Sequence, residues 1–210
     1  MTIRIGLYGG SFNPIHVGHL IVARVAAELL GWERVYLIPS GQPPHKRAGA
    51  LLDGCHRAAM IRAAIADDPL FELDEHDLRQ TGRCYTVNTV AHFAERLGAG
   101  VELHWLIGAD SLSELATWHR VADLVGSCRV VTAARPGWEA PSLDALRPHL
   151  TDEQIGQLRS DILDTPRIDV SASAVRGRVA DGLSIRYLVP ESVRAYIETH
   201  GLYRHDAGGQ

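Results

Sequence analysis

The stretch Gly9-Gly10-Ser11-Phe12-Asn13-Pro14-Ile15-His16-Val17-Gly18-His19 joins two segments of different periodicity. The apolar run Ile3–Tyr8 before it predicts a buried first strand. The segment after it repeats apolar residues at helical spacing, which predicts a core face of Val22, Val25, Ala26, Leu29 and Leu30. A strand, a glycine turn and a helix N-terminus together favour an anion site, because unpaired backbone N–H groups and the positive end of the helix dipole point the same way.

The glycines and histidines of this stretch suit a bound group. Gly9 and Gly10 permit close approach of the backbone, while His16 and His19 lie three residues apart, so both rings can face one ligand. The spacing fits neither G-x-x-x-x-G-K-[ST] nor G-x-G-x-x-G. A zinc site would need three or four ligands, and no cysteine is near. The structural alternative is that His16 caps the helix and His19 is a surface histidine with satisfied hydrogen bonds.

Composition limits the class of protein. The 210 residues are 46% hydrophobic and 22% charged, which suits one globular domain with an ordinary core. A net charge of −4 argues against a non-specific nucleic-acid binder. Three widely spaced cysteines are typical of reduced thiols in the cytoplasm. No signal peptide or long apolar span is predicted, so we expect a cytoplasmic protein that does not bind membranes.

Apolar runs and helical segments alternate along the rest of the chain. Further strands are expected at Arg34–Pro39, Phe71–Leu73, Val101–Gly108, Arg129–Ala133 and Ile168–Val170. Further helices are expected at Gly54–Ala66, Tyr85–Leu97 and Thr151–Leu163, and from Pro190 to Gly201. In the Gly54–Ala66 helix, Arg57 and Arg62 are expected to face outward. Residues 75–83 read as a charged loop, and 138–164 as an insertion over the surface.

This alternation predicts an α/β fold with right-handed crossovers: a Rossmann-like, doubly wound parallel sheet with flanking helices. A single domain is expected over residues 1–204, followed by a flexible tail at 205–210. At strand ends, Gly108 would let a ligand approach the backbone, and Asp110 could accept a ribose hydroxyl. Ser171 is placed to cap a helix on which Ser173 and Arg176 share a face. Each of these segments also has a structural interpretation, as a cap, a solvated turn or, for Trp118, a core residue.

The His16-Val17-Gly18-His19 motif after Gly-Gly-Ser-Phe resembles the signature of the nucleotidyltransferase superfamily. Five further segments resemble motifs of the bacterial nicotinate mononucleotide adenylyltransferases, in the expected order between about Ile3 and Tyr203. They are Pro43-Pro44-His45-Lys46, Tyr85-Thr86-Val87-Asn88-Thr89, Gly108-Ala109-Asp110, Trp118-His119 and Val170-Ser171-Ala172-Ser173-Ala174-Val175-Arg176. The departures are Asn88 in place of Asp, Val170 in place of Ile, and Ser173 in place of Thr.

The resemblance implies transfer of the AMP moiety of ATP to nicotinate mononucleotide, giving deamido-NAD and pyrophosphate. It implies catalytic roles for His16, His19 and Arg176. The implied ATP-binding residues are Gly9, Gly10, Ser11, Phe12, His16, His19, Gly108, Asp110, Ser171, Ser173 and Arg176. The implied mononucleotide-binding residues are His45, Lys46, Thr86, Asn88, Trp118, His119 and Arg135. Mg²⁺ is expected to arrive with ATP, without a dedicated protein metal site, and Trp118 to stack on the pyridine ring.

Several alternatives stay open on the sequence. The acceptor could be phosphopantetheine or nicotinamide mononucleotide, as in other enzymes with the His-x-Gly-His signature. A catalytically silent nucleotide-binding module would bind ATP without releasing pyrophosphate. A purely structural interaction protein would not need three separate motifs around one sheet edge. ATP and nicotinate mononucleotide are the expected partners, with no nucleic acid or membrane, and a homo-oligomer is left open.

Overall fold

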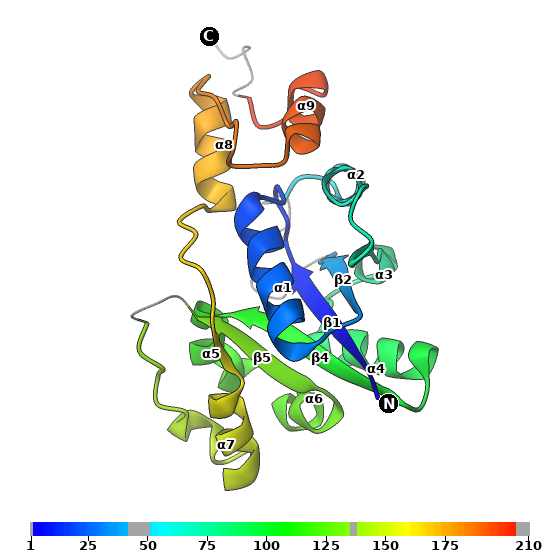
Figure 1. Cartoon of the computed structure of the whole chain (residues 1–210), viewed down its shortest axis with the longest axis vertical. Coiled ribbons are helices and arrows are strands. Elements are labelled where there is room, and N and C mark those ends of the chain that lie inside the picture. The colour runs from blue at the N-terminus through cyan, green and yellow to red at the C-terminus, as the bar shows by residue number, and fades with distance from the viewer. Residues whose placement is uncertain (1, 42–50, 135–137, 205–210) are drawn as a thin grey trace.

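The computed structural model describes residues 2–41, 51–134 and 138–204. Its centre is one parallel sheet with the strand order β3-β2-β1-β4-β5-β6 (Figure 1). The strands are β1 (Ile3–Gly10), β2 (Arg34–Pro39), β3 (Phe71–Leu73), β4 (Val101–Gly108), β5 (Arg129–Ala134) and β6 (Ile162–Asp164). This is the order of a doubly wound Rossmann sheet, and it confirms the predicted fold class.

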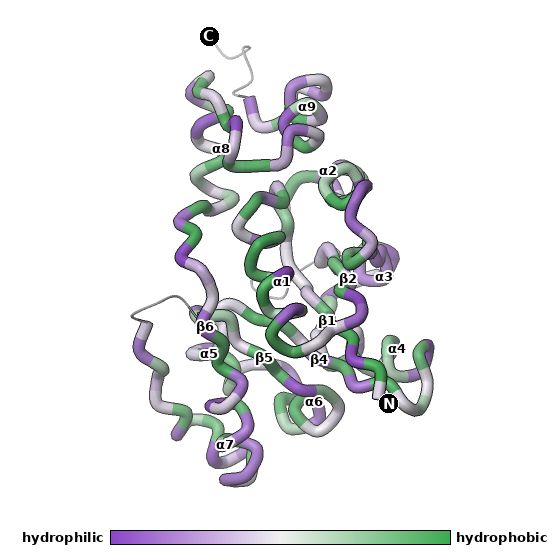
Figure 2. Tube along the Cα trace, viewed as in Figure 1, coloured by the Kyte–Doolittle hydropathy of each residue, from purple (hydrophilic) through white to green (hydrophobic). Residues whose placement is uncertain are grey.

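Helices connect the strands and cover both faces. They are α1 (Val17–Leu30), α2 (Gly54–Ala64), α3 (His76–Arg79), α4 (Thr86–Leu97), α5 (Ala109–Glu114), α6 (Val121–Ser127), α7 (Asp152–Ser160), α8 (Ala172–Ala180) and α9 (Glu191–Thr199), with 3-10 turns η1 (Leu115–Thr117) and η2 (Asp144–Leu146). Side chains of α1, α2, α8 and α9 form one core with one face of the sheet. Side chains of α4, α5, α6 and α7 form a second core with the other. In Figure 2 hydrophobic positions run along most of α1.

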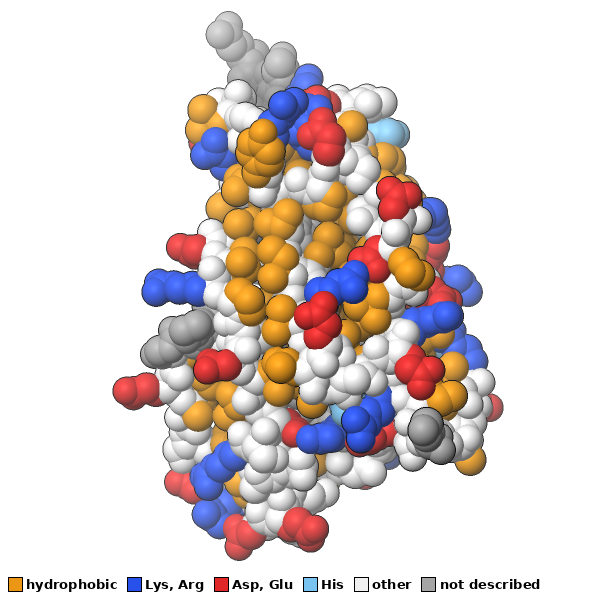
Figure 3. Space-filling view, in the orientation of Figure 1, with side chains coloured by type: hydrophobic (Ala, Val, Ile, Leu, Met, Phe, Trp, Pro, Cys, Tyr) orange, Lys and Arg blue, Asp and Glu red, His pale blue; other side chains and the backbone are white. Residues whose placement is uncertain are grey.

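Five local expectations were wrong. Residues 76–79 form helix α3 instead of a loop. The segment 151–163 divides into α7 and strand β6, and residues 165–170 form no strand. Leu29 is 59% exposed, because the small residues Ala23, Ala26 and Ala27 face the sheet instead. Hydrophobic side chains reach the surface along the middle of the face that carries α1 (Figure 3).

The fifth concerns Arg57, which is buried and not outward-facing. Helix α2 packs against α9 as well as the sheet, so one more side of it is covered than amphipathic spacing indicates. Arg62 is exposed, as expected, and pairs with Glu75. The tail 205–210 lies outside the described residues.

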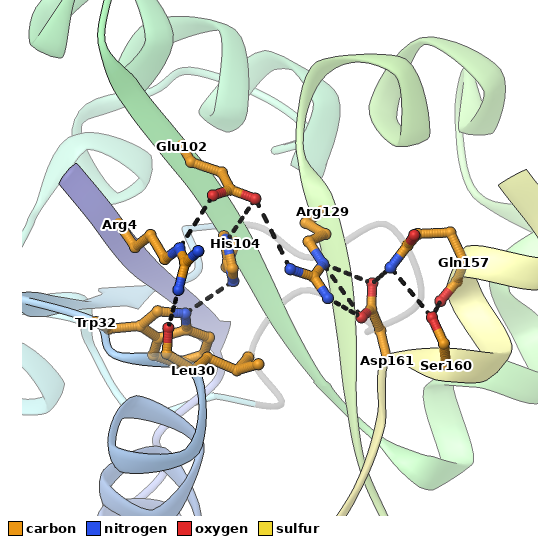
Figure 4. Close-up of polar contacts among 9 residues, drawn as sticks. All are labelled: Arg4, Leu30, Trp32, Glu102, His104, Arg129, Gln157, Ser160 and Asp161. Atoms are coloured by element: carbon orange, nitrogen blue, oxygen red, sulfur yellow. Dashed lines mark hydrogen bonds and ion pairs between the residues drawn. The ribbon is translucent and has the colours of Figure 1, made fainter. Parts of the chain in front are cut away.

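A polar network stabilises the amino ends of the strands (Figure 4). The indole Nε1 of Trp32, just beyond α1, donates to Nδ1 of the fully buried His104 at 2.8 Å. The Glu102 carboxylate lies 3.2 Å from Arg4 Nε and from His104 Nε2. This network ties the end of α1 to β4 at the edge of the sheet opposite the strand ends that carry the sequence motifs.

Candidate active site

Two clefts open at the carboxyl ends of the strands, on either side of the junction between β1 and β4. Here the connections lead to opposite edges of the sheet, which is where ligands bind in open α/β sheets. The clefts measure about 630 Å³ and about 590 Å³, and both are lined by Tyr8, Ser11 and Gly108. Residues from the two ends of the sequence meet in the first cleft, which therefore matches the predicted meeting of motifs.

His16 and His19 lie together in the wall of the first cleft. Their rings stack with centroids 3.7 Å apart, and His16 is buried at the N-cap position of α1. Burial lowers the pKa of His16 to about 4. Burial, with His16 beside it, lowers the pKa of His19 well below its ordinary value. Both rings are therefore neutral at pH 7.

The hydrogen bonding of His19 assigns its tautomer. Nδ1 of His19 accepts the backbone N–H of His16 at 3.2 Å, so the neutral ring carries its proton on Nε2. His19 is thus a neutral N–H donor. The capping alternative is half right, since His16 occupies the N-cap position but its side chain makes no cap hydrogen bond.

Gly18 lets the histidines come this close. A Cβ atom at this position would lie 3.1 Å from Nδ1 of His16 and 3.4 Å from Ile168 Cγ2. A side chain there would push the imidazole from the helix. The glycine of the motif is therefore explained by the packing of the ring beside it.

Gly9 and Gly10 leave room for aromatic side chains of the protein itself. A Cβ atom on Gly9 would lie 2.5 Å from the indole of Trp105, and one on Gly10 would lie 3.1 Å from the ring of Phe12. Both glycines line the second cleft and not the first. The close approach they permit is made by aromatic side chains of the protein.

The backbone N–H groups of α1 are only partly available. The N–H of Val17 donates to the carbonyl of Leu188 at 3.1 Å. The first N–H group of the helix is therefore already hydrogen-bonded and is not available to an anion. The first turn of α8 also lines the first cleft, with Ser171 accepting from the N–H of Ala174 as its cap. The cap at Ser171 was predicted correctly.

Arg176 projects from α8 to the N-terminal loop. Its Nη1 donates to the carbonyl of Asn13 at 2.7 Å, and its Nη2 lies 3.3 Å from the Ser173 hydroxyl. The hydroxyl of Tyr203 donates to Oδ1 of Asn13 at 2.7 Å. Asn13 is therefore bonded both to Arg176 and to Tyr203. In Figure 1, α8 lies beside the start of α1.

The second cleft is lined by Thr86, Trp118 and His119, as the motifs predicted. Trp118 is half-buried and also packs against the core, so the core alternative is partly right. The ring of His119 lies 4.3 Å from the ring of Tyr85. Asn88 is exposed and does not line the cleft, because its neighbours Val87 and Thr89 are the buried residues of this turn of α4.

Glu114 lines the second cleft and was not predicted as a site residue, and neither were two charged residues of the segment 75–83. Asp77 is buried, accepts the Thr89 hydroxyl at 2.8 Å and has its pKa raised by burial. Arg83 lines the cleft, is exposed, and has no ion-pair partner among residues 2–41, 51–134 and 138–204. Both lie in the segment read as a charged loop, where no periodicity separates a functional charge from a solvated one.

The other residues expected at the site either line the first cleft or lie outside the described residues. Phe12, Asp110, Ser171 and Ser173 line the first cleft. Asn13, Trp138 and Arg167 line it too and were not predicted as site residues. His45, Lys46 and Arg135 lie outside the described residues. Within the described part of the chain no three His, Cys, Asp or Glu side chains are grouped to hold a metal ion.

Comparison with known proteins identifies the family of this chain. Residues 7–178 match the model of the cytidylyltransferase-like family. Curated relatives named "Probable nicotinate-nucleotide adenylyltransferase" include one from Moorella thermoacetica, 38% identical over 96% of this chain and 92% of that protein. Another, from Rubrobacter xylanophilus, is 41% identical over 98% and 94%. The chain belongs to the cytidylyltransferase-like family and, within it, to the nicotinate-nucleotide adenylyltransferases.

Members of this family share the fold seen here. A solved structure described as "Plasmodium falciparum nicotinic acid mononucleotide adenylyltransferase complexed with NaAD" has a TM-score of 0.73 and covers 96% of this chain and 97% of its own. At 17% identity this match shows the fold alone. No helix among the described residues is long and apolar enough to cross a membrane.

Proposed function

We propose that this nicotinate-nucleotide adenylyltransferase binds ATP in the first cleft and nicotinate mononucleotide in the second, and joins them into deamido-NAD with release of pyrophosphate. The observation that carries this assignment is that the two clefts meet at Tyr8, Ser11 and Gly108. The α-phosphate of one ligand and the phosphate of the other would come together there. Family membership supports the reaction, and the residues that line each cleft support the assignment of ATP to the first cleft and of the mononucleotide to the second.

The first cleft suits a triphosphate. His19 offers Nε2–H, Arg176 offers a planar guanidinium already oriented by Asn13, and the first turn of α8 adds the positive end of a helix dipole. Neutral imidazoles donate without adding full charges to the site. The second cleft suits a pyridine mononucleotide, because Trp118, Tyr85 and His119 provide aromatic faces.

The transfer needs no covalent nucleophile from the protein. A phosphate oxygen of the mononucleotide attacks the α-phosphorus of ATP, the bond to the bridging oxygen breaks, and pyrophosphate carries the electron pair away. The chain must hold two anions against their repulsion and stabilise charge on the departing group. His16, His19 and Arg176 are the residues we assign to this task.

Mg²⁺ would enter as part of the ATP complex. Asp110, on the first turn of α5, is a carboxylate in the first cleft, but the described residues form no cage of three or more metal ligands. Mg²⁺ keeps several waters and is commonly held by substrate phosphates with one or two carboxylates. This donor set fits a metal brought by the nucleotide.

Preference for the acid over the amide would come from N–H donors without a matching acceptor. Thr86 and His119 line the second cleft, and neither backbone N–H has an acceptor in the described part of the chain. Arg83 adds a cation, whereas Arg120 pairs with Asp123 at 2.6 Å outside the cleft. Each charge-assisted bond contributes ~1.5–3 kcal/mol, against about 1 for a neutral acceptor.

The test is pyrophosphate release from Mg-ATP with a panel of acceptors: nicotinate mononucleotide, nicotinamide mononucleotide and phosphopantetheine. We expect kcat/KM for the acid to exceed that for the amide by at least about tenfold, since 1.4 kcal/mol corresponds to a factor of ten. His119→Ala should keep this preference, because it keeps the N–H. Turnover with phosphopantetheine alone would refute the assignment, and equal kcat/KM for the two pyridine nucleotides would refute its acid selectivity.

A further inference from the structure

Arg57 is a buried cation that the proposed reaction has not yet used. It is 2% exposed, and none of the carboxylates in residues 2–41, 51–134 and 138–204 forms an ion pair with it. Burying an unpaired charge is unfavourable unless hydrogen bonds or a nearby anion compensate it. Its neighbour on α2, Arg62, is exposed and paired with Glu75, so the burial is particular to Arg57.

The guanidinium bonds two backbone carbonyls from separate parts of the chain. Its Nε donates to the carbonyl of Leu52 and its Nη1 to the carbonyl of Ser11, each at 2.9 Å. Leu52 lies in the segment that leads into α2. Ser11 lies in the loop before α1, and this residue lines both clefts. Arg57 therefore holds the backbone at the junction of the two ligand sites.

A second cation holds the same loop from another element. Arg176, on α8, donates to the carbonyl of Asn13, two residues beyond Ser11. In Figure 1, α2 and α8 lie on opposite sides of the start of α1. The loop is thus fixed from both sides, but Arg176 lines the first cleft and Arg57 does not.

We propose that Arg57 is a positioning residue, which fixes the Ser11 backbone so that the two reacting phosphates meet in line. It also places behind them a buried positive charge that has no ion-pair partner among the described residues. Arg57 acts through Ser11 and touches neither substrate. A planar guanidinium can reach two carbonyls in fixed directions, whereas a lysine ammonium is a single point of charge. The proposal rests on the adenylyl transfer proposed above.

The expected effect is on the chemical step. A misplacement of about 1 Å can reduce a rate by about a hundredfold, so Arg57→Lys and Arg57→Ala should lower kcat by about ten- to a hundredfold. KM for ATP and for the mononucleotide should change little, because the groups that contact them remain. Arg62→Ala, on the same helix, is the matched control and should keep both constants.

Chemical rescue separates a guanidinium role from packing. Guanidinium ion at non-denaturing concentration should restore part of the kcat of Arg57→Ala, whereas urea, which has nearly the same shape without the charge, should not. If Arg57→Ala does not fold, the proposal is tested with Arg57→Lys, which should show a lower kcat and an unchanged KM. Circular dichroism and urea unfolding show whether this variant is native.

Two results would overturn the proposal. One is a folded Arg57→Lys enzyme with the kcat of the wild type. The other is an Arg57→Ala defect that guanidinium leaves unchanged or that urea repairs equally, which would show that Arg57 only fills space. Absence of pyrophosphate release from the wild type would instead contradict the proposed function, so the two failures are distinct.

Discussion

Burial of His16 predicts that the protein loses stability in mild acid. The folded state holds the ring neutral with a pKa of about 4, and the unfolded chain has the ordinary value of 6.5. Because the folded pKa is lowered, the stabilising contribution is present above pH 6.5 and is lost as the pH falls towards 4. At 1.36 kcal/mol per pH unit, the full loss from this ring is about 3 kcal/mol. Between pH 7 and pH 4.5 the loss is about 2.5 kcal/mol by the same relation.

Urea unfolding at pH 7, 5.5 and 4.5 measures this loss when wild type is compared with His16→Gln. Glutamine does not titrate, so its packing defect is the same at each pH and cancels in the comparison. The variant should therefore lose about 2.5 kcal/mol less than the wild type over this range. Removing His16 also removes one of the two effects that lower the pKa of His19. The variant should then lose still less stability in acid, which increases the difference from the wild type.

His149→Gln, the same substitution at an exposed position, is the control for the change of residue type. Equal loss of stability in wild type and His16→Gln would show that the imidazole is not held neutral by burial. A variant that lost more stability in acid than the wild type would reverse the sign of the argument. Either result would also weaken the assignment of His16 as a neutral group beside the phosphates.

Three further expectations can be tested separately. His19→Ala should lower kcat by ~10²–10³-fold, the usual effect of losing one preorganised donor, which is far more than it lowers the free energy of unfolding measured in urea; wild-type kcat would return His19 to a capping role. Nicotinate mononucleotide should quench tryptophan fluorescence, and Trp118→Phe should remove most of that quenching; quenching that persists in this variant would contradict stacking. Trp32→Phe should reduce the free energy of unfolding by about 1–3 kcal/mol, because Nδ1 of His104 is left without its donor, and kcat should be unchanged; an unaltered unfolding midpoint would contradict the importance of that hydrogen bond.

The sequence predicted most of the sheet because its strands are short segments rich in apolar residues, even where Glu102 and His104 interrupt the pattern. β2, β3 and β4 were predicted with the bounds that the structure shows, and β5 to within one residue. Strand β6 was missed because Ile162 and Leu163 alone cannot be separated from the helical pattern before them. The inward face of α1 was predicted correctly at Ala26, but Leu29 was wrong, because apolar residues fall on more than one side of the helix and the alanines pack against the sheet.

The residues of the candidate site were likewise predicted only in part. Motifs at strand ends placed His16, His19 and Trp118 in the clefts, because parallel strands bring their carboxyl ends to one edge. Asp77 and Arg83 were missed because a charge in an aperiodic segment looks like any solvated charge. Asn88 was expected in the second cleft through its neighbours in the motif, but the turn of α4 directs it to solvent.

The contacts that hold the loop between β1 and α1 could not be predicted from the sequence, because each of them joins this loop to a residue far along the chain. Ser11 is held by Arg57 and Asn13 by Arg176 and Tyr203. The N–H of Val17 is held by the carbonyl of Leu188. Such contacts leave no periodicity and no motif, since a carbonyl acceptor belongs to every residue. In the reaction proposed here the motif residues carry the chemistry, while α2 and the segment from α8 to Tyr203 hold the loop on which several of them lie.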